Sequence, residues 1–185
     1  MHLVDVVLFL HIATALLAFA IGGIIHAGEW SARRATTVGE LRGSLATGHR
    51  LEPLFPVLLA LLFGLGAWLI HLDKPEFRFK DDWITVSIGA VVVLLVVGGA
   101  VLAPRSKRRK ESLAGPGTEA ISPELRASVN DAVLWRFGHF NTGLALAVVF
   151  LMTTKPHLLG SLVAVAVGAL AGIAIGSLGR QRALA

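Results

Sequence analysis

The stretch Leu3–Ala27, LVDVVLFLHIATALLAFAIGGIIHA, decides the fold of this chain. Asp5 is its only acidic or basic residue apart from histidine, and a helix of this length, rising about 1.5 Å per residue, crosses a hydrocarbon core about 30 Å thick. Further apolar segments of similar length follow it. They occupy residues 51–71, 83–103, 137–154 and 158–178. The sequence therefore predicts an all-α membrane protein with five transmembrane helices.

The composition supports a membrane location and excludes several other classes of protein. Apolar residues make up 55% of the chain, more than the ~45–50% typical of soluble domains. The net charge of +5 is better explained by contact with the anionic surface of the bilayer than by nucleic acid binding. Because the chain contains no cysteine, it has no disulfides, thiolate metal sites or cysteine nucleophiles. The first apolar stretch is too long for a cleaved signal peptide, so we expect a retained helix.

Lysine and arginine are distributed unevenly between the connections. Of the 17 basic residues, only Lys74, Arg78, Lys80 and Lys155 lie on the side of the second and fourth connections. The others gather on the opposite side: Arg33, Arg34, Arg42, Arg50, Arg105, Lys107, Arg108, Arg109, Lys110, Arg126, Arg136, Arg180 and Arg182. The positive-inside rule then predicts an N-terminus outside and a C-terminus in the cytoplasm, across a bacterial inner membrane. Five spans require ends on opposite sides, so the count and the charges agree.

We interpret residues 1–185 as a single transmembrane domain whose longest connection is a cytoplasmic loop at residues 104–133. A run of basic residues and the sequence Gly115-Pro116-Gly117 are typical of a solvated loop. Near its end, Ser122-Pro123-Glu124 predicts the start of an interfacial helix that continues straight into the fourth span.

The first cytoplasmic connection carries a similar start signal. Thr37 and Glu40 are expected to cap a short helix through Leu41 and Leu45. At the other side of the membrane, the turn between the fourth and fifth spans is tight and centred on Pro156.

A faint internal repeat links these connections. Glu40–Ser44 (ELRGS) recurs as Glu124–Ser128 (ELRAS), and Lys74-Pro75 recurs as Lys155-Pro156. The repeat predicts two helical hairpins in the same orientation, related by an axis along the membrane normal, with the fifth span outside the repeat. Chance similarity between two interfacial helices is the alternative.

The fifth span carries small residues at every fourth position. They are Gly160, Ala164, Gly168, Gly172 and Gly176. Small residues let another helix backbone approach closely inside a membrane. The stripe is expected to pack against the other spans of this chain, or else to form a homo-oligomer or to bind a partner membrane subunit.

His11 is the ionisable side chain expected deepest in the bilayer. It lies about 10 Å below the outer surface, and an ionisable group at such a depth is a functional candidate. A neutral imidazole also serves as a hydrogen-bonding group between helices. The functional alternatives are an axial ligand of haem b, metal binding or proton transfer.

A second polar group is expected at the cytoplasmic boundary. His26 ends the first span, His49 and Glu52 begin the second, and His139 and Asn141 open the fourth. If these helices are neighbours, the imidazoles and the carboxylate are suitable ligands for a divalent metal (His26, His49, His139) or for a haem iron (His49, His139). A purely interfacial role is the alternative. On the same reasoning, Trp30, Trp83 and Trp135 are expected in the aromatic belts.

Two short motifs carry a family resemblance. The sequences Leu8–Ile12 (LFLHI), followed by Gly22-Gly23, and Leu151–Pro156 (LMTTKP) resemble a family of uncharacterised bacterial integral membrane proteins. The first is also distantly similar to the copper-resistance D and HemJ-type protoporphyrinogen oxidase membrane proteins. The HemJ-type resemblance implies haem at His11.

The leading functional hypothesis is a small, non-enzymatic membrane protein that serves as a subunit or scaffold of a larger assembly. The alternative is a redox or porphyrin-handling protein that binds haem b through His11. A transporter is disfavoured because the spans offer few polar groups for a translocation path.

Overall fold

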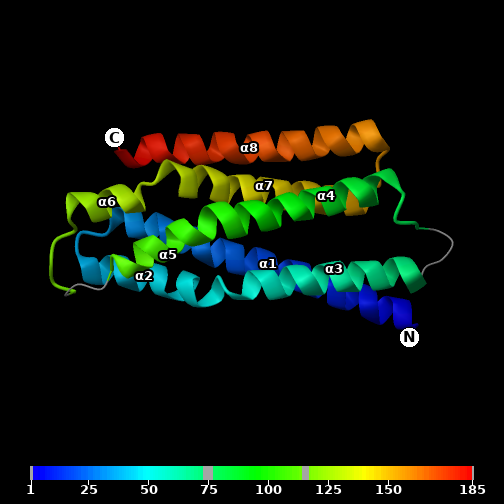
Figure 1. Ribbon diagram of the computed structural model, residues 1–185, viewed down its shortest axis with the longest axis horizontal. Helices are drawn as coiled ribbons and strands as arrows, with labels where there is room; N and C mark the ends of the chain where they lie inside the picture. Colours follow the sequence, from blue (N-terminus) through cyan, green and yellow to red (C-terminus); the bar gives the residue numbers. More distant parts are fainter. Residues whose placement is uncertain (1, 73–76, 114–116, 185) are drawn as a thin grey trace.

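The computed structural model describes residues 2–72, 77–113 and 117–184, with side chains as far as Leu178. The molecule is an elongated bundle whose helices run along a common axis, with the two termini at opposite ends (Figure 1). The helices are α1 (Leu3–Arg34), α2 (Val38–Leu51), α3 (Leu54–Leu72), α4 (Asp82–Val96), the π-helix η1 (Val97–Leu102), α5 (Ala103–Glu111), α6 (Pro123–Val129), α7 (Ala132–Thr154) and α8 (Leu158–Leu184). No strand occurs within these described ranges.

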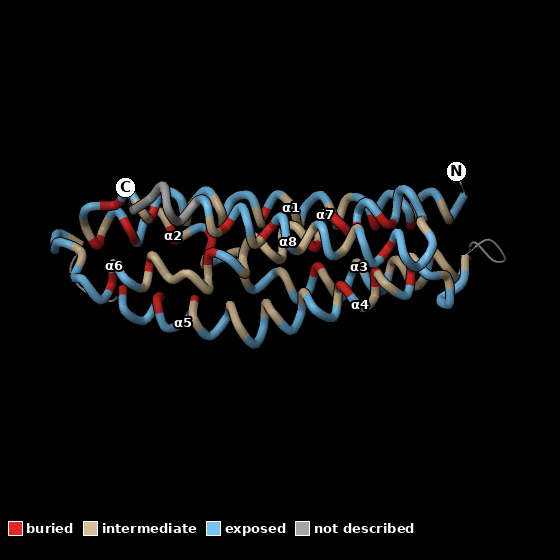
Figure 2. The backbone as a smooth tube through the Cα atoms, turned by 90° about the horizontal axis from the view of Figure 1, so that it is seen from above, coloured by how far each residue is buried: buried red, intermediate tan, exposed pale blue. Residues whose placement is uncertain are grey.

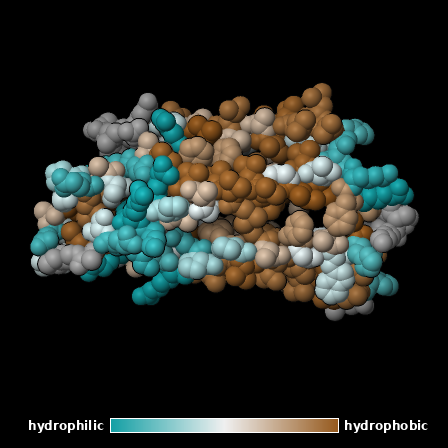
Figure 3. All heavy atoms as spheres, viewed as in Figure 1, coloured by the Kyte–Doolittle hydropathy of each residue, from teal (hydrophilic) through white to brown (hydrophobic). Residues whose placement is uncertain are grey.

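Five helical segments of the described chain are long and apolar enough to cross a membrane, which confirms the predicted fold class. They are Leu3–Arg34, Val38–Leu72, Asp82–Glu111, Pro123–Thr154 and Leu158–Leu178. Most of their apolar side chains face outward, and the middle of the molecule presents a broad hydrophobic surface between two hydrophilic ends (Figure 3). Such a surface is suited to lipid rather than water.

The spans are arranged as two hairpins and an outer helix. α1 pairs with α3, and α4 pairs with α7, so that each hairpin joins the spans expected from the repeat. α8 packs along α7 in the most extensive helix pair of the molecule, and it lies at the edge of the bundle (Figure 1).

One end of the bundle extends beyond the apolar zone as a folded cap, which we define as α2, α5, α6 and the last two turns of α1. Thr37 caps α2 and forms the expected capping box with Glu40, and Ser122 caps α6. Both start signals in the sequence are therefore confirmed. The cap has a hydrophobic core of its own, visible as buried positions in Figure 2. Its members are Ala32, Ala35, Val38, Leu41, Leu45, Leu113, Leu125 and Val129.

The cap core is larger than the buried cluster between the spans, which consists of Ala90, Leu144 and Val148. The difference follows from the solvent. Burying apolar side chains is favourable against water, at about 25 cal/mol per Å², but gains little against lipid. The spans are therefore held by close backbone approach and polar contacts, and the cap by an ordinary core.

Within the connection predicted at residues 104–133, the expectation of a solvated loop from Pro104 is wrong as far as Glu111, because the third span continues through η1 and α5 to that residue. The helix expected near the end of the connection is present as α6. Residues 114–116, which include most of the Gly115-Pro116-Gly117 motif, lie outside the described residues.

Helix continuation through Pro104 depends on η1. Proline lacks the amide donor and its ring crowds the carbonyl of the residue four positions earlier, so it normally ends a helix. The π-helix η1 ends two residues before Pro104, and its hydrogen bonds run between residues five apart instead of four, as from the amide of Ala103 to the carbonyl oxygen of Gly98. The carbonyl oxygen of Val101, which follows the residue four positions before Pro104, accepts a hydrogen bond from the Arg105 guanidinium at 3.0 Å. The chain therefore continues as α5 instead of becoming a loop.

The predicted continuous run of α6 into the fourth span is also wrong. α6 ends at Val129, and Asp131 caps α7 by accepting a hydrogen bond from the amide of Val133 at 2.7 Å. The tight turn around Pro156 is confirmed, because α7 ends at Thr154, Lys155 adopts a left-handed conformation and α8 begins at Leu158.

α7 and α8 approach so closely that no side chain fits between them along part of their length. A Cβ atom built on Gly172 would lie 2.3 Å from the carbonyl oxygen of His139, and one on Gly168 would lie 2.5 Å from that of Gly143. A Cβ on Gly176 would lie 2.9 Å from the Cα of Arg136. These glycines of the stripe face α7 of the same chain, whereas Gly160 faces Pro156.

Candidate functional site

Polar side chains concentrate where the cap meets the spans, and a buried ion pair lies at their centre. The guanidinium of Arg109 on α5 donates to both carboxylate oxygens of Glu29 on α1, with one of the bonds at 2.8 Å. Only 2% of the Arg109 side chain and 15% of the Glu29 side chain are exposed. A two-pronged pair in such surroundings is strong and directional. It ties the first hairpin to the second.

A second contact between the hairpins runs parallel to this ion pair. The hydroxyl of Ser106, one turn before Arg109, donates to the carboxylate of Glu52 at 2.9 Å. His49 precedes Glu52 by one turn of α2 and is half-buried. Its Nε2 atom is buried and has no hydrogen-bond partner among the described residues.

His26 and His139 lie against each other across the hairpins. Their ring centroids are 4.5 Å apart, as expected if the first and fourth spans are neighbours. The Nε2 of His26 lies 2.9 Å from the Thr142 hydroxyl, and the Nδ1 of His139 lies 2.9 Å from the carbonyl oxygen of Trp135. Each imidazole therefore has one nitrogen in a hydrogen bond within the bundle.

Trp135 is not a belt residue, contrary to the prediction. Only 4% of its surface is exposed, because the guanidinium of Arg33 covers its ring at 3.9 Å from the centroid. Trp30 contacts it edge-on from α1, and His139 packs against it from within α7. The cation–π contact adds to the connection between α1 and α7.

Two arginines of the repeated sequence make reciprocal contacts across the cap. Arg42 of α2 donates to the carbonyl oxygen of Leu113, just past the end of α5, at 2.6 Å. Arg126 of α6 donates to the carbonyl oxygens of Arg33 and Ala35, at the end of α1, at 3.2 and 2.6 Å. Carbonyl groups at helix ends lack partners within the helix. The arginine of each repeated segment therefore caps a helix of the other hairpin: Arg42 caps α5, and Arg126 caps α1.

The apolar partners of these arginines are equivalent as well. Leu41 and Leu125, which precede the arginines, are both buried in the cap core, and so are Leu45 and Val129 one turn later. The matching environments of the two segments favour a true repeat over chance similarity.

His11 lies far from the polar cluster, in the half of the bundle away from the cap. A helix rises about 1.5 Å per residue, so it is about 22 Å along α1 from His26. Its ring packs against Gly66 of α3, where a built Cβ would lie 3.3 Å from the imidazole Cε1. The Nδ1 atom is buried and has no hydrogen-bond partner among the described residues.

The structure therefore brings some of the candidate residues together and separates others. His26 and His139 are in contact, whereas His11 is too distant to share one haem with either His139 or His49. Among the described residues, no group of three or more His, Asp or Glu side chains is placed to hold a metal ion, so His26, His49 and His139 do not form a three-ligand set with one another or with a carboxylate.

Sequence reasoning missed the residues that hold the cluster together, namely Glu29, Ser106 and Arg109. Glu29 stands three residues after His26 on the same helix, and this spacing was a usable signal. Arg109 is hidden in a basic run, where nothing distinguishes it from its exposed neighbours Arg108 and Lys110.

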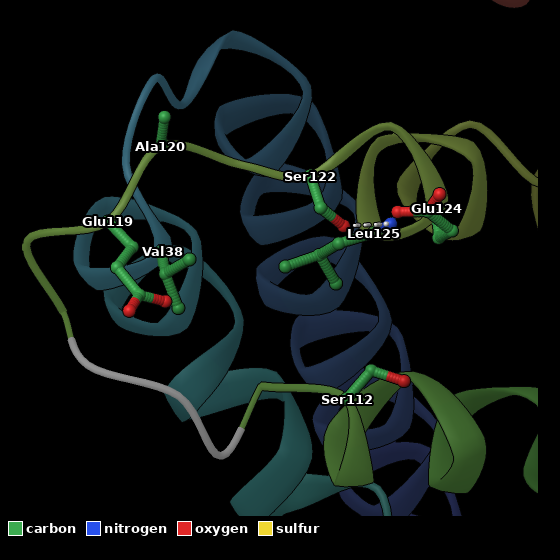
Figure 4. A pocket seen from close by; sticks show the side chains of 7 residues that line it. All are labelled: Val38, Ser112, Glu119, Ala120, Ser122, Glu124 and Leu125. Carbon is green, nitrogen blue, oxygen red and sulfur yellow. Dashed lines mark hydrogen bonds between the residues drawn. The ribbon is translucent and has the colours of Figure 1, made fainter.

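Two open grooves flank the cap. The first is lined by Val38, Ser112, Glu119, Ala120, Ser122, Glu124 and Leu125, and two of its polar side chains, Ser122 and Glu124, belong to the start of α6 (Figure 4). There the Ser122 hydroxyl accepts from the amide of Leu125. The second groove lies between α2 and the end of α5 and is lined by Arg42, Ala46, His49, Arg50, Lys110 and Leu113.

Comparison with known proteins gives a family but no characterised relative. A family model described as "Predicted integral membrane protein (DUF2269)" matches residues 5–156, most of the chain. The match confirms the resemblance to a family of integral membrane proteins. No curated protein and no solved structure matches the chain.

Proposed function

Because this chain belongs to the DUF2269 family of predicted integral membrane proteins, we propose that it is a non-enzymatic subunit or scaffold of a larger membrane assembly. One observation carries this proposal. Buried and half-buried charged side chains near the membrane, those of Arg109, Glu29 and Glu52, are used in contacts between the two hairpins. Ionisable groups at membrane depth are by default candidates for a reaction centre or a translocation path. Here their partners are structural.

The contacts that support the proposal come from every cap helix. Arg109 is bound to Glu29, Glu52 to Ser106, and Arg42 and Arg126 to carbonyl oxygens at helix ends. Such contacts hold the hairpins in one arrangement and leave few charged groups for proton or ion transfer. A rigid membrane body with a folded cap suits a protein that positions other subunits.

We expect the protein, when extracted from its native membrane in a mild detergent, to migrate with a second polypeptide at a fixed ratio. The protein mass of the particle, measured by light scattering, should differ from every whole-number multiple of the 19.5 kDa chain mass. Arg126→Ala, which uncaps α1, should remain in the membrane but lose the second polypeptide. Arg108→Ala, an exposed arginine of α5, is the control and should retain it. Particles that contain only this chain would contradict the scaffold role.

Haem binding at His11 is the second candidate function, and the buried, unpartnered Nδ1 favours it. When bound, haem would supply electron-transfer chemistry. The described residues offer His11 as a single buried axial ligand, because His26, His49 and His139 lie near the cap, and the histidines at the other end, His2, His71 and His157, are exposed. The same purified sample distinguishes the two candidates. A Soret band that disappears in His11→Ala and His11→Gln, but persists in the exposed His157→Ala, would favour haem, whereas a colourless wild-type protein favours the scaffold.

The proposed orientation places the cap in the cytoplasm and the N-terminus outside a bacterial inner membrane. It rests on the gathering of basic residues at the cap, against Arg78, Lys80 and Lys155 at the other end. A reporter that is active only in the cytoplasm should therefore work when fused after Ala185 and fail when inserted at Phe79. The reverse pattern of activity would overturn the orientation.

A further inference from the structure

The groove between α2 and α5 is lined by basic and uncharged side chains. Its lining includes Arg42, His49, Arg50 and Lys110, together with Ala46 and Leu113, and it contains no acidic side chain. The cavity measures about 310 Å³, large enough for a small polar group. Arg50 and Lys110, the two exposed charges of the groove, have no part in the scaffold role or in the haem hypothesis.

The positive charge in this groove is not neutralised by the nearby carboxylates. Arg50 and Lys110 are exposed and form no ion pair within the described part of the chain. The acids near these helices have other partners: Glu29 on α1 pairs with Arg109, Glu52 accepts from Ser106, and Glu111 on α5 pairs with Lys107. His49 also lines the groove, and its Nε2 atom is buried and has no hydrogen-bond partner among the described residues.

The position of the groove relative to the membrane narrows the choice of ligand. α2 ends at Leu51 and the apolar α3 begins at Leu54, so His49 and Arg50 stand where the span leaves the hydrocarbon zone. Lys110 stands at the corresponding level on α5, beyond the apolar part of the third span. Lipid phosphates lie at this level, and basic pockets between helices are typical sites for anionic headgroups.

We propose that this groove binds a phosphate ester, presented by the headgroup of an anionic glycerophospholipid. Arg50 and Lys110 supply charge-assisted hydrogen bonds to the phosphate oxygens, and the Nε2 of His49 gains the partner that it lacks in the protein. Arg42 is held beside the groove by the Leu113 carbonyl group. The site is independent of the scaffold role, and each proposal fails or stands separately.

Native mass spectrometry of the detergent-solubilised protein with phosphatidylglycerol or phosphatidylcholine tests this proposal. We expect the protein to retain phosphatidylglycerol and not phosphatidylcholine. Arg50→Gln/Lys110→Gln should weaken this binding roughly 30-fold, because each charge is worth about 1 kcal/mol next to anionic lipid. Lys107→Gln/Arg108→Gln removes the same charge from exposed positions on α5 outside the groove and should weaken binding far less.

Three results would overturn the assignment. Equal losses in the two double variants would show general attraction to a basic surface. Equal retention of the two lipids would exclude recognition of the anionic headgroup. Glycerol 3-phosphate that binds as tightly as the lipid, with the same loss in Arg50→Gln/Lys110→Gln, would reassign the groove to a soluble phosphate ester.

All groove substitutions are at exposed positions, and an unchanged melting temperature verifies folding. The single variant Arg50→Gln provides the comparison if the double variant melts earlier.

Discussion

Gly172→Ala is expected to destabilise the protein strongly, although it adds only one methyl group to the fifth span. The new Cβ would lie 2.3 Å from the carbonyl oxygen of His139 and 2.9 Å from the Cα of Phe140, both of which are backbone atoms that no side-chain rotation can move. α8 must therefore shift away from α7. Overpacking of this kind costs about 1–3 kcal/mol, and Gly168→Leu/Gly172→Leu should cost more and detach much of α8.

Thermal unfolding in detergent measures the effect, and Gly64→Ala is the matched control. Gly64 lies in a membrane-spanning helix with nothing within 4 Å of its built Cβ. Alanine has the higher helix propensity, so this control should be neutral or stabilising by up to about 1 kcal/mol. Equal stability of Gly172→Ala and Gly64→Ala would mean that α7 and α8 do not approach as described. The partner-binding role for the stripe would then return.

Arg109→Met is expected to have the second large effect. It leaves the carboxylate of Glu29, which is 15% exposed, without its charged partner. Removing one partner of a buried pair typically costs 3–5 kcal/mol, and the interfacial position of this pair suggests roughly the lower end of that range. The double variant Glu29→Met/Arg109→Met removes both charges and should recover most of the lost stability.

Lys107→Met provides the control for this prediction, because Lys107 forms an exposed ion pair with Glu111 on the same helix. Their side chains are 79% and 64% exposed, and such pairs contribute about 0–1 kcal/mol. The melting temperature should therefore hardly change. If Arg109→Met behaves like this control, the Glu29 pair does not hold the hairpins together.

The spans and the helix starts were predictable because their signals are local. Long apolar runs need a bilayer wherever they fold, and the capping groups of Thr37 and Ser122 act within one turn. Pro104 was misleading for the opposite reason. A proline after an apolar run usually ends a helix, and only the π turn in front of it, which no residue pattern announces, allows α5 to continue.

The candidate site could be predicted only where it was possible to predict which helices are neighbours. The sequence predicted the proximity of His26 and His139 only on the condition that the first and fourth spans are neighbours, and their ring contact meets that condition. The burial of Arg109 depends instead on the rotation of α5 about its own axis. Each residue turns a helix by about 100°, so the extra residue of a π turn decides which basic side chain of the run faces Glu29. Hydropathy does not contain that information.

The reciprocal arginine contacts of the cap have a consequence for biogenesis. The carbonyl groups of Arg33 and Ala35 receive their partner only when Arg126 has been synthesised, more than 90 residues later. Arg42 must likewise wait for the carbonyl group of Leu113. The first hairpin is therefore synthesised with its cap end incomplete, and that end gains its partners only when α5 and α6 have been synthesised. Quality control that removes unfinished membrane proteins therefore has an interval in which to act, which lasts until α6 has been synthesised after the third span.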